Sequence, residues 1–161
     1  MKNRAGIVVT LVCGLGCGVI QAQGSFGVGI IVGEPTGLTM KRWLNNTHAI
    51  DAGAAWSFSE NESFQFHADY LIHDFNMLRP ADFEGRVSLF YGLGGRIKLE
   101  DDDGSGRNED DTLVGIRIPL GITYHFPLQP VELFGEFVPI LDLAPDTDLD
   151  INLAIGARLY F

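Results

Sequence analysis

The sequence has little positive charge. It contains 11 Lys and Arg residues against 21 Asp and Glu residues in 161, so its formal net charge is −10 at pH 7. Binding to nucleic acid depends on clustered Lys and Arg side chains that neutralise phosphates. The sequence contains no such cluster, and we therefore expect no nucleic-acid partner.

Cysteine is nearly absent as well. Both cysteines, Cys13 and Cys17, fall within residues 1–22, which have the form of a secretory signal peptide: a short basic start followed by an apolar run. We expect cleavage near Ala22. The mature chain, residues 23–161, would then contain no thiol and could form no disulfide.

Two alternatives for residues 1–22 remain open. An uncleaved anchor is disfavoured because the apolar run, residues 5–20, is shorter than the roughly 20 residues that a membrane-spanning helix needs. Acylation of Cys17, as in a lipoprotein, is disfavoured because the residues before it lack the large aliphatic side chain expected three positions earlier.

Helical periodicity is lacking after residue 22. Instead, eight segments alternate between apolar and polar residues with the period of a strand, and turn-rich stretches separate them. A chain of this length forms one domain. Pro119 and Pro139 count against two central strands, because proline cannot donate to the ladder except at a bulge or rim. The predicted strands are residues 26–33, 37–44, 49–58, 64–73, 86–99, 113–126, 131–141 and 149–161.

The last predicted strand has one wholly apolar face. This face consists of Ile151, Leu153, Ile155, Ala157, Leu159 and Phe161. Such alternation suits two kinds of barrel. A soluble lipocalin-like barrel turns its apolar residues inward around a ligand, whereas a transmembrane barrel turns them outward to lipid.

The polar face favours the transmembrane barrel. It carries many glycines beside charges of both signs. The lumen of an eight-stranded barrel is only wide enough to be filled by side chains, so small residues and mutually paired charges suit an interior better than a solvated exterior. We therefore predict an all-β fold, an eight-stranded antiparallel up-and-down transmembrane β-barrel spanning residues 23–161.

Charged residues of the polar face are expected to plug the lumen with ion pairs. The seventh strand could turn either face outward, and we place Glu132 and Glu136 inside because charges in a bilayer are unfavourable. We expect the three arginines of this network to pair with its three acids. Its members are Asp69, Arg96, Arg117, Glu132, Glu136 and Arg158.

The connections also indicate an orientation. With eight strands, both ends of the barrel chain lie on the same side, which we take as the periplasm. Residues 100–112 are then the best candidate for an outer surface loop. Residues 74–84 fit this topology less well, because they are long for a periplasmic turn.

The acidic loop has part of a calcium-binding pattern. Asp101, Asp103 and Ser105 occupy the first, third and fifth places of a calcium-loop template, but Thr112 stands where a bidentate Glu is expected. We therefore expect a solvated acidic loop and no metal site. The alternative is weak binding of divalent cations that bridge lipopolysaccharide phosphates.

Three segments resemble small bacterial outer-membrane barrels. Gly156, Leu159 and Phe161 resemble the terminal signal read by the barrel assembly machinery, and residues 27–44 and 116–126 resemble the opening hairpin and sixth strand of uncharacterised members. The resemblance implies insertion in the outer membrane of a Gram-negative cell, in contact with lipid and lipopolysaccharide. Such barrels serve many functions, so it implies no particular activity.

Catalytic patterns are absent from the sequence. The four histidines do not pair with a nucleophile by spacing, and the His-x-Ser element of barrel deacylases is missing at His125. We expect no enzyme activity and no cofactor. The predicted function is a structural or surface-interaction barrel with a plugged lumen; the alternatives are a small-solute pore, a lipid-modifying enzyme and a soluble lipocalin-like binder.

Overall fold

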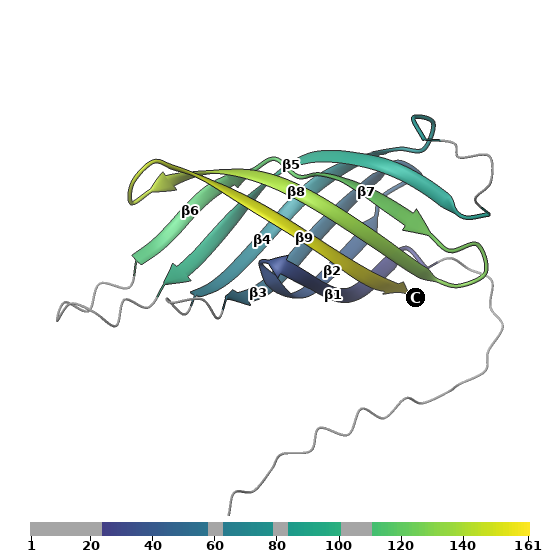
Figure 1. Ribbon diagram of the computed structural model, residues 1–161, viewed down its shortest axis with the longest axis horizontal. Helices are drawn as coiled ribbons and strands as arrows, with labels where there is room; N and C mark the ends of the chain where they lie inside the picture. Colours follow the sequence, from purple (N-terminus) through teal and green to yellow (C-terminus); the bar gives the residue numbers. More distant parts are fainter. Residues whose placement is uncertain (1–23, 58–62, 79–83, 101–110) are drawn as a thin grey trace, which may run out of the picture.

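The computed structural model describes residues 24–57, 63–78, 84–100 and 111–161. These residues form nine antiparallel strands and no helix (Figure 1). Nothing among them is a helix long and apolar enough to cross a membrane. The strands are β1 (Phe26–Glu34), β2 (Thr36–Trp43), β3 (His48–Ser57), β4 (Ser63–Asp74), β5 (Arg86–Glu100), β6 (Asp111–Arg117), β7 (Leu120–His125), β8 (Val131–Ala144) and β9 (Asp148–Tyr160).

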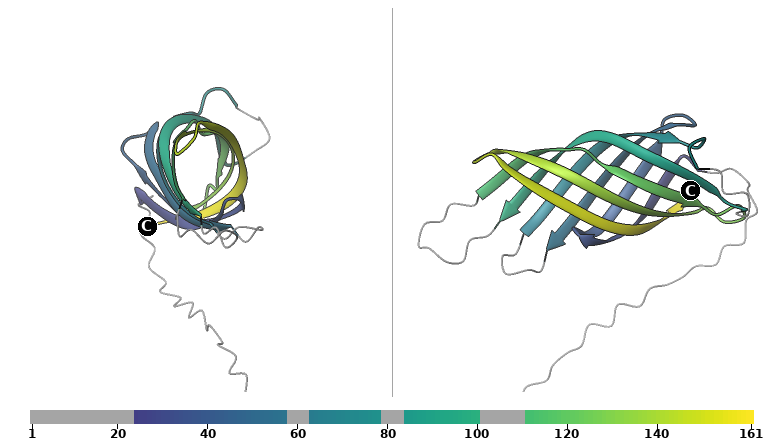
Figure 2. Two further views of the ribbon diagram at one scale, coloured as in Figure 1. Left: turned by 90° about the vertical axis from the view of Figure 1, so that its left-hand side faces the viewer. Right: turned by 45° about the horizontal axis from the view of Figure 1, so that its top comes forward.

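The sheet closes into a barrel because β1 pairs with β9. Each strand also pairs with its neighbours in sequence, except that β6 and β7 share a single position between β5 and β8. The nine strands therefore fill eight positions around the ring seen in the end-on view of Figure 2. The predicted architecture is confirmed, but the sixth predicted strand is divided in two.

Pro119 accounts for this division. Its ring leaves no backbone N–H for the ladder, so regular pairing stops between Arg117 and Leu120. Hydrogen bonds still cross the break: the Ile118 N–H donates to the Pro139 carbonyl (3.0 Å), and the Gly92 N–H donates to the Pro119 carbonyl (2.9 Å). The break interrupts the strand without opening the wall.

The stagger of the strands can be followed through paired residues. The path starts at Arg86 on β5 and crosses each of the remaining strand positions in turn. It returns to β5 at Arg96, ten residues further along the strand. The residues on this path are Arg86, His125, Glu132, Arg158, Gly29, Thr39, Gly53, His67 and Arg96. An eight-position barrel with this shear has strongly tilted strands and a lumen that side chains can fill.

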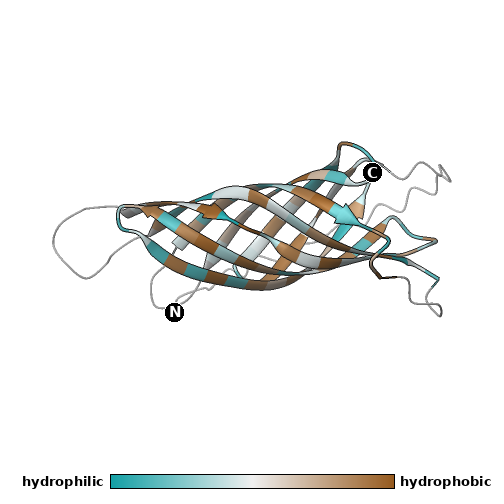
Figure 3. Cartoon of the chain, turned by 90° about the horizontal axis from the view of Figure 1, so that it is seen from above, coloured by the Kyte–Doolittle hydropathy of each residue, from teal (hydrophilic) through white to brown (hydrophobic). Residues whose placement is uncertain are grey.

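The two faces of the wall differ in polarity, as predicted. Brown and teal segments alternate along the strands in Figure 3, and the apolar residues point outward. Ile155 is 68% exposed, whereas Arg117 and Arg158 on the inner face are 0% and 3% exposed. This arrangement excludes the lipocalin-like alternative, which requires an apolar interior.

The barrel has two distinct ends. The terminal end carries the start of β1, the end of β9 and the turns after β2, β4 and β7, whereas the loop end carries the connections after β1, β3, β5 and β8. Residues 1–22 and the acidic segment 101–110 lie outside the described residues.

Candidate functional site in the barrel lumen

Charged side chains fill much of the lumen. Nine of them are 0–7% exposed, and each comes from the inward-facing row of its strand. They are Lys41, Asp51, Asp69, Arg96, Arg117, Glu132, Glu136, Asp142 and Arg158. Because buried charges are unfavourable unless paired, the contacts among them determine whether this interior is stable.

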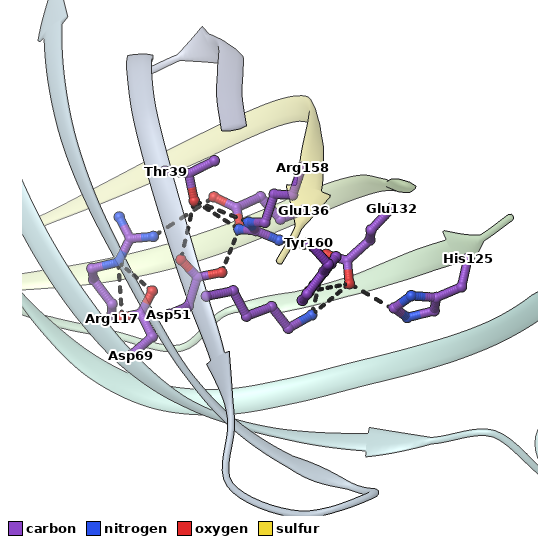
Figure 4. Close-up of polar contacts among 10 residues, drawn as sticks. Thr39, Asp51, Asp69, Arg117, His125, Glu132, Glu136, Arg158 and Tyr160 are labelled. Atoms are coloured by element: carbon purple, nitrogen blue, oxygen red, sulfur yellow. Dashed lines mark hydrogen bonds and ion pairs between the residues drawn. The ribbon is translucent and has the colours of Figure 1, made fainter. Parts of the chain in front are cut away.

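Glu132 is the centre of the largest cluster (Figure 4). Its carboxylate accepts hydrogen bonds from Lys41 Nζ (3.0 Å), Arg158 Nη1 (2.7 Å) and the Tyr160 hydroxyl (2.9 Å). His125 Nε2 lies 3.4 Å from the same carboxylate. One carboxylate therefore joins side chains from β2, β7, β8 and β9.

Arg158 extends the cluster across the lumen. Its guanidinium donates to Glu132, to Asp51 and, through Nη2, to the Thr39 hydroxyl (2.8 Å), which also donates to Asp51 (3.2 Å). One face of the guanidinium lies 3.8 Å from the centre of the Phe134 ring, a cation–π contact. Arg158 thus connects β9 to β2, β3 and β8.

Arg117 forms the neighbouring group. Its Nε donates to Asp69 (3.1 Å), and its Nη2 lies 3.7 Å from Glu136 Oε1. The predicted arginines Arg117 and Arg158 therefore each lie against predicted acids. Together with Lys41, they stand opposite four acids, so the central charges nearly balance.

The predicted pairing of Arg96 is wrong. Arg96 contacts Asp142, Asp150 (2.8 Å) and Gln65 (3.4 Å), none of which belongs to the predicted network. Through the ladder, Arg96 pairs with Gly115, and Gly115 pairs with Asp142. The Arg96 side chain therefore reaches an acid on the second strand along the sheet. The alternation within one strand does not predict this contact, because it depends on the register between strands.

The predicted network also omitted several side chains that contact its members. They are Lys41, Asp51, Asp142, Thr39 and Tyr160. All lie on the inward-facing rows of their strands. The alternation of each strand was therefore the sequence signal that could have indicated them. The choice among inward residues requires the cross-strand register.

Glycines make room for these side chains. A Cβ added at Gly94 would overlap Asp69 Oδ1, and one added at Gly115 would overlap Asp142 Oδ1. The abundance of glycine on the polar face therefore has a steric reason. The lumen is not wholly polar, however, because it also contains Ile31, Leu71, Phe90, Phe134, Val138 and Ile140, each 0–4% exposed.

A serine and a histidine lie in contact inside the barrel. Ser88 Oγ is 3.0 Å from His73 Nδ1 and 2.6 Å from Thr123 Oγ1. Ser88 and His73 are 0% and 2% exposed, so a substrate carbonyl has no access to this hydroxyl. The pair packs inside the lumen and connects β4, β5 and β7.

The metal candidates of the acidic loop cannot be placed in the lumen or at its ends. Asp101, Asp103 and Ser105 lie outside the described residues. Among the residues that are described, no group of three or more His, Cys, Asp or Glu side chains is placed to hold a metal ion. At the end of β9, Leu159 and Phe161 point outward, and Gly156 lies on the inner face.

Comparison with protein families identifies the chain. Residues 20–158 match the family described as Protein of unknown function (DUF3996). The chain belongs to this family. A comparison with curated proteins finds no match.

Solved structures share the barrel fold. The N-terminal β-barrel domain of Pseudomonas aeruginosa OprF has a TM-score of 0.59 at 12% identity, and the match covers 86% of this chain and 100% of that domain. Neisserial surface protein A has a TM-score of 0.47 at 13% identity, covering 85% and 97%. Ail, the attachment invasion locus protein of Yersinia pestis, has a TM-score of 0.45 at 12% identity, covering 86% and 97%. The likeness to the OprF domain supports the β-barrel fold of this chain.

Replacing the central carboxylate is expected to destabilise the barrel. In Glu132→Gln, Lys41 and Arg158 lose a shared buried counterion, so the free energy of unfolding falls by about 3–5 kcal/mol. The measurement is denaturant unfolding of the protein in phospholipid vesicles. Glu34→Gln, at an exposed position on β1, is the matched control. Equal losses in the two variants would contradict the role of Glu132.

Two adjacent glycines provide a test of lumen packing. Gly94→Ala places a methyl group against Asp69 and the Ala68 carbonyl, and we expect a loss of about 1–3 kcal/mol. At Gly95, on the outer face, the nearest atom to an added Cβ is the Gly115 carbonyl oxygen at 3.6 Å. Gly95→Ala should therefore retain the wild-type unfolding midpoint. If both substitutions had the same effect, the lumen would not be tightly packed at Asp69.

Proposed function

We propose that this protein is an integral outer-membrane barrel with a closed lumen, acting as a structural or surface-interaction protein and not as a channel. The observation that carries this proposal is the burial of the central charges. Lys41, Arg117 and Glu132 are each 0% exposed, although their side chains project into the barrel lumen. Water-filled passages would leave such groups accessible.

The outer wall supports a membrane location. Apolar side chains from every strand point outward and are 38–68% exposed, among them Ile30, Leu93, Ile122 and Leu153. Soluble monomers rarely expose continuous apolar surface of this extent. A bilayer would cover it, and the closed strand ladder would leave no backbone edge in hydrocarbon.

The two ends of the barrel suggest an orientation. The terminal end would face the periplasm, so the loop end would face the outside of the cell. Asp146 and Asp148 are exposed at the loop end, and the acidic residues 101–110 belong to a connection at the same end. This acidic surface would favour divalent cations, which could bridge its carboxylates to lipopolysaccharide phosphates.

Conductance tests the closed lumen directly. Purified protein inserted into planar lipid bilayers is expected to give no steady current steps, because the ion pairs around Glu132 and Arg158 occupy the passage. A porin of known conductance, added to the same bilayer, provides the positive control. Large and steady steps from this protein would overturn the proposal in favour of a small-solute pore.

A charge on the outer wall tests membrane insertion. Ile155 lies midway along β9 and points outward. We expect Ile155→Arg to lower the free energy of unfolding from vesicles by about 2–4 kcal/mol, because the charge enters the centre of the bilayer. Leu128→Arg, in the exposed turn between β7 and β8, should change it by at most about 0.5 kcal/mol. Similar small effects at both positions would argue against a bilayer around β9.

A further inference from the structure

A cavity opens at the terminal end of the barrel. It has a volume of about 320 Å³, within the usual range of small-molecule sites. Residues from the starts or ends of five strands line it, together with the turns after β2, β4 and β7 and the segment before β1. The closed-lumen proposal assigns no role to this cavity.

Aromatic rings form one wall of the cavity. The ring centres of Trp43, Phe75 and His125 lie 5.9–6.2 Å from one another. The rings are tilted by 34–51° to one another, so they form an angled aromatic wall against which a planar ligand ring can pack by its face or its edge. Asn45, in the turn after β2, adds an amide at the same mouth.

The charge of the cavity is unlike that of the protein. Arg86 is the only charged side chain among the described residues that line it, although acids outnumber bases in the chain. Its guanidinium carbon lies 4.3 Å from the centre of the Phe75 ring, which holds the side chain at the rim. A lining with one arginine and no carboxylate favours an anion.

The base of the cavity is closed. Tyr160, 8% exposed, lies there with its hydroxyl donating to the buried Glu132. The Arg86 and His125 backbones are paired in the ladder, so both side chains point into the same mouth. A ligand could therefore enter from the terminal end and bind, but the ion pairs beyond Tyr160 would stop it from passing through.

We propose that this cavity is a binding site for a small anion with a flat ring, such as an aromatic carboxylate. The ring stacks on the wall formed by Trp43, Phe75 and His125, and the carboxylate pairs with Arg86. In the orientation given above, the site faces the periplasm. Binding itself depends neither on that orientation nor on whether the lumen conducts.

The two tryptophans allow a direct measurement. Trp43 lines the cavity, whereas Trp56 lies on the outer face of β3. In a Trp56→Phe background, Trp43 is the only tryptophan, and its fluorescence reports on the cavity. The folded protein in detergent is titrated with benzoate, and in parallel with benzylamine, which has the same ring and the opposite charge, and with acetate, which has no ring.

We expect a saturable fluorescence change with benzoate, with a midpoint on the order of 1 mM for so small a ligand. Benzylamine and acetate should give none. Arg86→Gln should raise the benzoate midpoint about tenfold, whereas Arg86→Lys should recover part of the affinity. Arg42→Gln, an exposed arginine on the outer face of β2, is the matched control and should leave it unchanged.

Three results would overturn the site. They are equal responses to benzoate and benzylamine, an unchanged midpoint in Arg86→Gln, and no saturable response to benzoate. Migration of the unboiled variants on a gel checks that each is folded. Since the titration does not measure current, a failure here is distinguishable from a failure of the closed lumen.

Discussion

The hydrogen-bonded ion pairs between Glu132, Arg158 and Asp51 are the interaction on which the interior of this barrel depends. An eight-position barrel has no space for a loop or a water column at its centre, so side chains must fill it. Charges in that space must neutralise one another, because each is removed from water. Glu132 meets this requirement with partners from three other strands. The same contacts that stabilise the wall therefore close the passage.

The period of two connects this interior to the outer surface. Each strand presents its polar residues inward and its apolar residues outward. A shift of strand register by one residue would therefore exchange the two faces. Glycine is abundant on the inner row because Asp69 and Asp142 occupy the space that a side chain at Gly94 or Gly115 would need. Composition, packing and polarity are thus consequences of one geometric arrangement.

Most of the fold could be predicted from the sequence, because alternation is a local property. It predicted the eight strand positions, the outward apolar face and the inward placement of Glu132 and Glu136. The pairing of Arg96 with Asp142 and Asp150 could not be predicted, because it depends on the stagger between strands. The same holds for the cavity beside Arg86, whose lining is assembled from strand ends far apart in the sequence.

The strand β9 has two structural roles. β9 supplies the edge that pairs with β1, and it also carries Arg158, the cation shared by Asp51 and Glu132. Without β9, the sheet would have an open edge at β1, and its central acids would lack one of the cations that neutralise them. Closure of the hydrogen-bonded wall and charge neutralisation in its interior therefore depend on the same strand.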